Sequence, residues 1–424
     1  MKIKLKYGNG FKELNIPSKN VIDILKMRSI KQHDNPHQLI KQKLNSPIGS
    51  KPLNKLIKER NPLNIVIIVS DITRPGPFTV LIRTLVDVIL NIGIKSNKIR
   101  FVIANGTHRK MAENEMRFQY GDWIVDNFQI ENHDCRADDL VFLGKMKSGN
   151  ELWINRTVAN ADFLITIGVL NTHYFAGFGG GRKSILPGIC GYETIRRNHS
   201  NIIHDYSRLG KLEGNLIHLE MCEAAQKVGV DFSINMLVNH EKQLVDCFAG
   251  DISKAFLKGV DGIKELYSVK FHQYADAIFV SVGGYPKDIN FYQSQESLNK
   301  TIDLVRPNGI IVLIGEWKEG VGQPEMEKVL VSAKNLDELF AVKQKDIQIG
   351  GHRAFATGKL LKKVDILVIS SMHPDKVRQL HFIPMKSLLD CMNFIMNKFG
   401  ENFKSYIVPN GSMFFPIAEM NKKG

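Results

Sequence analysis

The chain has 424 residues, of which 43% are hydrophobic, and a formal net charge of +14. This length exceeds one ordinary domain and this apolar content supplies real cores, so two domains are expected and a disordered chain is excluded. The five cysteines are scattered and form no Cys-x-x-Cys pair. This usage argues against a disulfide scaffold and a thiolate zinc site, and it predicts a cytoplasmic protein.

The positive charge is spread along the chain, with a modest excess of lysine in the first sixty residues. A nucleic-acid partner would require basic residues clustered on one face or alternating with stacking aromatics, so none is predicted. A weak positive field would favour small anionic substrates. The opening MKIKLKYGNG lacks the apolar core of a signal peptide and no apolar run spans a bilayer, so no membrane association is expected.

The first elements in chain order are a β-hairpin and a series of buried strands. Residues 2–17 alternate around Gly-Asn-Gly and predict the hairpin. A helix is expected over 217–229, with Glu220 on its outward face. Short β-branched runs of the kind found in parallel sheets predict strands at 64–71, 99–106, 162–171 and 231–239.

A second alternation of strands and helices begins near residue 270. Apolar runs at 275–284, 309–316, 364–371 and 405–411 alternate with helical segments such as 297–306. The sequence therefore predicts an α/β protein of two domains with mainly parallel sheets, residues 1–268 and 269–424. An active-site cleft between the domains is expected, because ligands commonly bind at such places.

Polar residues follow three of the predicted strands directly. Asp71 and Arg74 follow the first strand, His108 the second and His173 the third. The carboxyl ends of parallel strands meet at one edge of the sheet, where ligands bind. Imidazoles at that edge can donate and accept protons near neutral pH. We therefore predict a functional site here, with an Asp71–Arg74 salt bridge as the structural alternative for those two residues.

A glycine-rich segment follows, Gly177-Phe-Gly-Gly-Gly-Arg-Lys-Ser. It has the length of a phosphate-binding loop, but Arg182 stands where the last glycine is required, which argues against nucleotide hydrolysis. Backbone amides around Gly179 and Gly180 remain candidates to contact one phosphate. Lys183 beside the Arg182 cation is a candidate for covalent modification, because a neighbouring cation favours the uncharged, nucleophilic amine.

His199 closes this segment and is a candidate metal ligand. Together with His108 and His173 it suggests a three-histidine zinc hydrolase as an alternative. That alternative gives no role to Lys183.

The motifs together resemble the nickel-dependent lactate racemases, with the wider group of 2-hydroxyacid racemases and epimerases. The resemblance extends over nearly the whole chain, and its glycine-loop block is long and specific. It rests on DITRP, NGTHR, NTH, GGGRKSILPGICGYETI and RNH in the first half, and on GGYPKDINFYQSQESL and GGHRAFATG in the second.

The resemblance implies a nickel-pincer nucleotide, a pyridinium mononucleotide whose nickel is held by carbon and two sulfurs. Lys183 would carry this cofactor through a covalent thioamide, and His199 would complete the nickel coordination. Separate cofactor-synthesis enzymes are implied as partners.

The resemblance also implies roles for the residues at the strand ends. His108 and His173 would be the paired acid/base residues that serve the two faces of a small 2-hydroxy acid during hydride transfer. Asp71 would contact the cofactor, and Arg74 would stabilise the substrate.

Two positions in the second half depart from the family pattern. Tyr292 and Gln293 match it, but Glu296 stands where a lysine would help to hold the substrate carboxylate. A carboxylate there repels an anionic substrate by about 1 kcal/mol or more, unless it accepts hydrogen bonds from further substrate hydroxyls or points outward. His352 replaces a bulky aromatic residue. These changes predict a substrate larger than lactate, or else a catalytically silent paralogue that binds a nucleotide or sugar acid.

Overall fold

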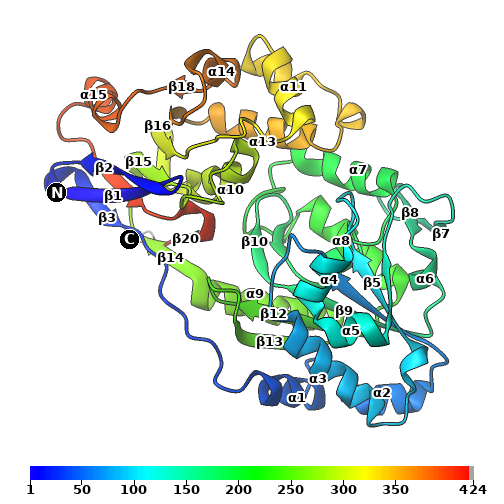
Figure 1. Cartoon of the computed structure of the whole chain (residues 1–424). Helices are drawn as coiled ribbons and strands as arrows, with labels where there is room; N and C mark the ends of the chain where they lie inside the picture. Colours follow the sequence, from blue (N-terminus) through cyan, green and yellow to red (C-terminus); the bar gives the residue numbers. More distant parts are fainter. Residues whose placement is uncertain (420–424) are drawn as a thin grey trace, which may run out of the picture. The chain divides into compact units, whose positions relative to one another are not determined.

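A computed structural model of the chain describes residues 1–419 and divides them into two compact units. One unit comprises residues 29–266, and the other joins residues 1–28 to the part of the chain from Tyr267 onward. Each unit has its own six-stranded, largely parallel sheet, which confirms the predicted α/β class (Figure 1). Within residues 1–419 no helix has both the length and the apolar character needed to cross a bilayer.

The sheet of unit 29–266 has the order β13-β12-β9-β4-β5-β6. All its pairings are parallel except that of β13 with β12. The predicted strands are confirmed as β4, β5, β9 and β12, whereas β6 and β13 were missed. The strands are β4 (Ile65–Ser70), β5 (Ile99–Ala104), β6 (Gln129–Asn132), β9 (Phe163–Val169), β12 (Phe232–Val238) and β13 (Leu244–Gly250).

Helices cover this sheet, and two short antiparallel hairpins extend from it. The hairpins are β7 (Val141–Lys145) with β8 (Glu151–Ile154), and β10 (Asn171–His173) with β11 (Gly177–Gly179). The helices are α1 (Pro36–Asn45), α2 (Leu53–Arg60), α3 (Phe78–Leu90), α4 (Glu113–Tyr120), α5 (Asp122–Asn127), α6 (Arg156–Ala159), α7 (Tyr192–Ser200), α8 (Leu216–Val228) and α9 (Ile252–Tyr267).

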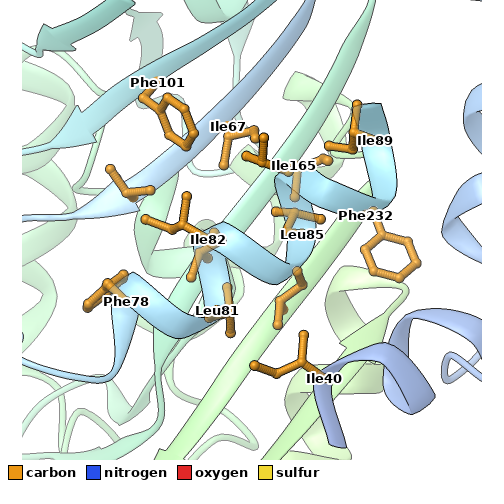
Figure 2. Packing of buried hydrophobic residues seen from close by; sticks show 14 of the residues in the cluster. Ile40, Ile67, Phe78, Leu81, Ile82, Leu85, Ile89, Phe101, Ile165 and Phe232 are labelled. Carbon is orange, nitrogen blue, oxygen red and sulfur yellow. The ribbon is translucent and has the colours of Figure 1, made fainter. Parts of the chain in front are cut away.

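The main core of this unit forms where α3 packs on the sheet (Figure 2). Phe78, Leu81, Ile82, Leu85 and Ile89 of α3 are completely buried. They recur at helical spacing, so one face of α3 is apolar and faces the strands. This packing fixes the strands whose carboxyl ends carry the candidate site.

Helix α8 is confirmed close to its predicted range, but one of its faces was wrongly predicted. Glu220 was expected to point outward, and it is 5% exposed. Its carboxylate accepts hydrogen bonds from the Asn198 amide of α7, at 2.8 Å, and from the Ser148 hydroxyl. Periodicity alone assigns a charged residue to solvent and misses such buried polar partners.

The other unit is built on a sheet of order β18-β17-β16-β15-β19-β3, in which every pairing is parallel. The strands are β3 (Val21–Ile24), β15 (Ala275–Ser281), β16 (Val305–Ile314), β17 (Asp365–Ile369), β18 (Ile383–Pro384) and β19 (Ser405–Val408). A separate parallel pair is β14 (Ser268–Phe271) with β20 (Phe415–Ala418).

Both faces of this sheet are covered, as a parallel sheet requires. The helices of this unit are α10 (Phe291–Thr301), α11 (Pro324–Ser332), α12 (Leu336–Phe340), α13 (Gly351–Leu361), α14 (Pro374–Gln379) and α15 (Leu388–Phe399). One face of the sheet packs against α15 and the N-terminal hairpin, and the other packs against α10, α11, α13 and α14.

The hairpin predicted at the N-terminus is present as β1 (Lys2–Tyr7) and β2 (Gly10–Asn15). The prediction assigned it to a domain of residues 1–268, whereas residues 1–28 pack with the later part of the chain. Leu5, Leu14 and Ile16 enter the core that contains β15 and β16, and β3 extends the sheet beside β19. The boundary near residue 268 itself lies close to the observed division.

Because residues 1–28 pack with the second unit, a core substitution in the N-terminal hairpin should destabilise that unit. Leu14 is fully buried, so Leu14→Ala should lower the free energy of unfolding by about 2–5 kcal/mol. Amide hydrogen exchange should accelerate in β15 and β16 and remain unchanged in β4 and β5.

The adjacent Glu13→Ala, which removes only an exposed ion pair with Lys2, is the matched control and should have little effect. Faster exchange in β4 and β5, with β15 and β16 still protected, would contradict the assignment of residues 1–28.

Candidate active site

The strand ends of unit 29–266 bring Asp71 and His108 together. Asp71 follows β4, His108 follows β5, and the Nδ1 atom of His108 lies 2.6 Å from Oδ2 of Asp71. Asp71 is 3% exposed, whereas the His108 side chain is 48% exposed. The other carboxylate oxygen accepts hydrogen bonds from the backbone N–H and the hydroxyl of Thr73. A buried carboxylate therefore orients an accessible imidazole.

The carboxyl group of Asp71 is held in its ionised form. Burial by itself raises its pKa, but the hydrogen bond and charge of His108, with smaller contributions from Thr73 and Arg74, lower the pKa below the usual value. Because Asp71 accepts at Nδ1 of His108, the Nε2 atom is the one left to exchange protons.

Arg74 does not form the salt bridge that was considered for it. Within residues 1–419 its guanidinium makes no ion pair with Asp71, and its Nη1 donates to the carbonyl and hydroxyl oxygens of Thr73. Arg74 is half-buried beside the Asp71–His108 pair.

A second group of predicted residues surrounds the ring of Phe175, in the turn of the β10–β11 hairpin. The ring centroid of His173 lies 4.4 Å from that of Phe175, and the ring centroid of His199 lies 4.9 Å from it. The Nζ atom of Lys183 lies over the same ring at 5.5 Å. Phe175 is 3% exposed, so a buried aromatic side chain joins three residues from separate elements.

The two groups belong to the same end of the sheet. The loop that carries His108 is tied to the segment after Lys183 by a hydrogen bond from Gly106 N–H to the Gly188 carbonyl, at 2.9 Å. Gly188 lies against Ala104, the last residue of β5, where a Cβ atom would meet the Ala104 side chain at 2.7 Å. The close approach of these two segments requires glycine.

The glycine-rich segment is packed more tightly than the sequence suggested. Gly179 and Gly180 were predicted to leave the backbone open to a phosphate. Instead, the side-chain position at Gly179 is filled by Asn171, and that at Gly180 by Asn235 together with apolar side chains. The Gly181 N–H donates to Asn235 Oδ1 at 2.6 Å. These glycines let the segment lie against the sheet, and contact of their amides with a phosphate stays a prediction.

Arg182 is directed into the core. It is 2% exposed, and its Nε donates to Nδ1 of His218 on α8 at 2.8 Å. Burial, followed by the charge of Arg182, lowers the pKa of His218 to about 3, so this histidine is neutral. The Arg182 side chain therefore stabilises the fold around the hairpin. Its burial gives no support to a phosphate-binding loop of the nucleotide-hydrolase kind.

The other predicted residues lie on α10 and α13 of the second unit. The guanidinium of Arg353 lies 3.8 Å from the ring centre of Tyr292 and donates to the Tyr292 carbonyl at 2.7 Å. Gln293 is exposed in the first turn of α10. His352 is 6% exposed, and its Nδ1 accepts the N–H of Gly350 at 3.1 Å. The structure therefore buries His352 at the start of α13.

Glu296 is paired with a lysine one turn further along α10. Its carboxylate lies 2.7 Å from Nζ of Lys300, which also donates to the Ser412 carbonyl at 2.6 Å. The Lys300 side chain is 7% exposed and that of Glu296 is 38% exposed. Burial raises the pKa of Glu296, but Lys300, followed by Lys287 and Arg353, lowers it below its usual value. Glu296 is therefore an ionised, anchored group with cations in excess around it.

Several residues that organise the site were missed from the sequence. Thr73 lies inside the DITRP motif and Phe175 lies between the NTH motif and the glycine-rich segment, but neither carries a group that titrates near neutral pH. Asn215 and His218 are distant in sequence from the hairpin they support. The only signal was position, since Phe175 stands between His173 and Lys183 in the chain.

Comparison with known proteins identifies the family. Residues 7–210 match the lactate racemase N-terminal domain, and residues 270–415 match the lactate racemase C-terminal domain. The chain is also 32% identical to the lactate racemase of Thermoanaerobacterium thermosaccharolyticum, over 96% of this chain and 97% of that protein. The chain belongs to the lactate racemase family. It is therefore an isomerase of the racemase type, as the sequence motifs predicted.

Further relatives agree with this assignment. The lactate racemase of Lactiplantibacillus plantarum is 32% identical over 88% of this chain and 89% of its own length. The solved structure of the lactate racemase apoprotein from T. thermosaccharolyticum superimposes with a TM-score of 0.90 at 30% identity, covering 98% of this chain and all of that one. A protein from Thermotoga maritima, at 18% identity and a TM-score of 0.64, shares the fold alone, over 91% of this chain and all of its own.

The buried Asp71–His108 pair predicts a pH-dependent contribution to stability. Asp71→Asn should lower the free energy of unfolding at pH 7 by about 1–3 kcal/mol, because a buried charged hydrogen bond is lost. The pKa of Asp71 is lower in the folded chain than in the unfolded chain. Its contribution is therefore present above about pH 4 and is lost as the pH falls through the folded value.

Urea denaturation of wild type and variant at pH 7 and in acid measures this difference. Asp87→Asn, which breaks the exposed Arg83–Asp87 pair, serves as control and should change stability by less than about 0.5 kcal/mol. A difference for Asp71→Asn that grows in acid would show that the sign is wrong.

Proposed function

We propose that this racemase inverts the α-carbon of a 2-hydroxy acid by reversible hydride transfer to a nickel-pincer nucleotide bound covalently at Lys183. The observation that carries the proposal is the arrangement around Phe175. A lysine amine and two imidazoles from β10, η3 (Gly181–Ser184) and α7 contact one buried ring. Membership of the lactate racemase family supports the same reaction class.

The residues around Phe175 fit such a cofactor. Lys183 supplies an amine that can form the thioamide tether, and His199 supplies an imidazole of the kind that nickel accepts. Among residues 1–419 no three His, Cys, Asp or Glu side chains are placed to hold a metal by themselves. This favours a metal that brings ligands of its own, and it argues against the zinc hydrolase built on His108, His173 and His199. Separate enzymes would have to build the cofactor.

Lys183 and His199 would hold the cofactor, which would supply hydride-acceptor chemistry at the substrate α-carbon. The protein's part in the chemistry is proton transfer at the substrate hydroxyl. His108, oriented through Nδ1 by Asp71, would take or give the hydroxyl proton at Nε2, and His173 would do so for the other face. Proton balance requires one ring of the pair to be protonated at the start of a turnover. That ring gives its proton to the product hydroxyl, and the opposite ring ends with the proton taken from the substrate hydroxyl. Asp71 therefore acts through His108, a role added to the cofactor contact expected from the resemblance.

Substrate binding is assigned to Arg74 and to the polar residues of α10. An anionic carboxylate needs cations, and Arg74 is half-buried beside the Asp71–His108 pair. On α10, Glu296 is compensated by Lys300 and has Lys287 and Arg353 nearby, so the region around it is not net repulsive to an anion. We assign Tyr292, Gln293 and Glu296 to contacts with a substrate larger than lactate. We assign His352 to the same substrate-binding group, although its side chain is 6% exposed.

Turnover of single enantiomers in deuterated water tests the reaction. Nickel-loaded protein should racemise a 2-hydroxy acid while the α-hydrogen returns without exchange, because it moves as hydride. His108→Gln and His173→Gln should each lower kcat by about 10²–10⁴-fold, since each removes one acid/base group.

Chiral chromatography measures the rate of racemisation, and proton NMR measures how much of the α-hydrogen is retained. Substantial deuterium at the α-carbon would support simple proton abstraction and contradict the proposal. Substrate-analogue binding unchanged in both histidine variants, with no turnover in the parent protein, would instead identify a silent binding paralogue.

The assignment of Glu296 predicts a change in selectivity. Glu296→Gln should reduce kcat/KM for a 2,3-dihydroxy or longer hydroxy acid about tenfold relative to lactate, because a charged acceptor for the extra hydroxyl is lost. Kinetics on single enantiomers of lactate and of the larger acids, measured side by side, give the ratio of the two kcat/KM values.

Asp337→Asn, which breaks an exposed pair with Lys362, is the control and should leave the ratio unchanged. Brisk racemisation of lactate by the wild type, with none of the larger acids accepted, would refute the larger substrate.

A further inference from the structure

Arg182 is a buried cation with unusual partners. Besides His218, its guanidinium donates from Nη2 to the carbonyls of Phe178, at 3.0 Å, and Ala176, at 3.3 Å. Its plane lies over the ring of Phe256 on α9 at 3.8 Å. Arg182 thus connects α8 and α9 with the turn and the second strand of the β10–β11 hairpin.

This arrangement is not one that stability alone would favour. Within residues 1–419 no carboxylate forms an ion pair with Arg182, and its Nη1 makes no hydrogen bond, although the Cys222 thiol of α8 also interacts with the guanidinium. Burying a guanidinium without a counter-charge, and leaving one donor unsatisfied, both destabilise a fold. Apolar side chains of similar size would fill the same space with a smaller loss of stability. Departures from local rules of this kind are expected at functional sites.

The carbonyls that Arg182 binds lie where the hairpin presents its functional side chains. Ala176 and Phe178 flank Gly177, which pairs with His173 in the hairpin register. The preceding carbonyl, that of Phe175, accepts a hydrogen bond from Asn215 at 2.7 Å. The backbone that follows His173 is therefore held at three carbonyls, two of them by one rigid planar group.

We propose that Arg182 is a positioning residue of the active site, which sets the side chains of His173 and Phe175 through the main chain of the hairpin. Arg182 does not contact the reacting atoms in this role. A displacement of about 1 Å in a reacting group lowers rates by about two orders of magnitude, so such a clamp affects turnover strongly. The inference rests on the proposed function only in treating His173 as an acid/base residue.

The test compares Arg182→Met with Lys264→Met. Methionine has similar length but cannot donate to the carbonyls. Lys264 is an exposed cation of α9 that lies over the ring of Phe178 at 5.9 Å and makes no contact with the hairpin carbonyls. The control therefore removes a cation next to the same hairpin without removing the clamp.

Two readouts separate positioning from a general role in folding. The first is the Hε1–Cε1 NMR signal of His173 in cofactor-free protein with labelled histidine, identified among the 13 histidines by its absence in His173→Gln. The second is steady-state kinetics per folded molecule. Arg182→Met should shift or broaden the His173 signal and lower kcat at least tenfold with KM changed less than threefold. Lys264→Met should leave both unchanged.

If Arg182→Met does not fold, His218→Leu replaces it, since this variant keeps Arg182 and removes the acceptor of its Nε. A smaller shift of the His173 signal and a several-fold lower kcat are then expected. A folded variant with an unchanged His173 signal and unchanged kcat per folded molecule would overturn the proposal. If the wild type racemises no hydroxy acid, the proposed function fails, while the NMR comparison still decides whether Arg182 positions His173.

Discussion

The candidate site depends on one steric constraint, the close seating of residues 171–188 on the ends of β5, β9 and β12. A Cβ atom at Gly168 of β9 would lie 3.0 Å from the backbone nitrogen of Gly181, and that nitrogen donates to Asn235 of β12. Side chains at the glycines would lift the segment from the sheet. Because the segment is seated this way, Lys183 reaches the Phe175 ring, and the loop carrying His108 is tied to it through Gly188.

Neighbouring groups explain why three partly or fully buried side chains of the molecule can stay charged. Asp71 is buried but ionised, because His108 and Thr73 satisfy its two oxygens. Glu296 is anchored to buried Lys300, so a position that looked repulsive in the sequence carries no unpaired negative charge. Arg182 differs, since the groups that it contacts within residues 1–419 are neutral, including the His218 and Phe256 rings and two main-chain carbonyls. A buried cation of this kind is most simply explained by what its hydrogen bonds hold in place.

Much of the fold and part of the site follow from the sequence, for identifiable reasons. Buried parallel strands are continuous apolar runs, and the rule that ligands bind beyond their carboxyl ends selected Asp71, His108 and His173. The membership of residues 1–28 in the second unit was missed because a short edge strand such as β3 carries no signal of its partner. Glu220, Arg182 and Phe175 were misjudged or overlooked because their partners are set by tertiary packing. The Arg182–His218 hydrogen bond, for example, joins residues 36 positions apart.

The central claim is that Lys183 carries a nickel-containing cofactor beside His199. Its most direct test is the mass of the Lys183 peptide, with the metal content, in protein produced together with the cofactor-building enzymes. The account predicts an added mass on that peptide and about one nickel per chain, and in His199→Ala the added mass persists while nickel is lost. An unmodified Lys183 in protein that racemises a hydroxy acid would contradict it.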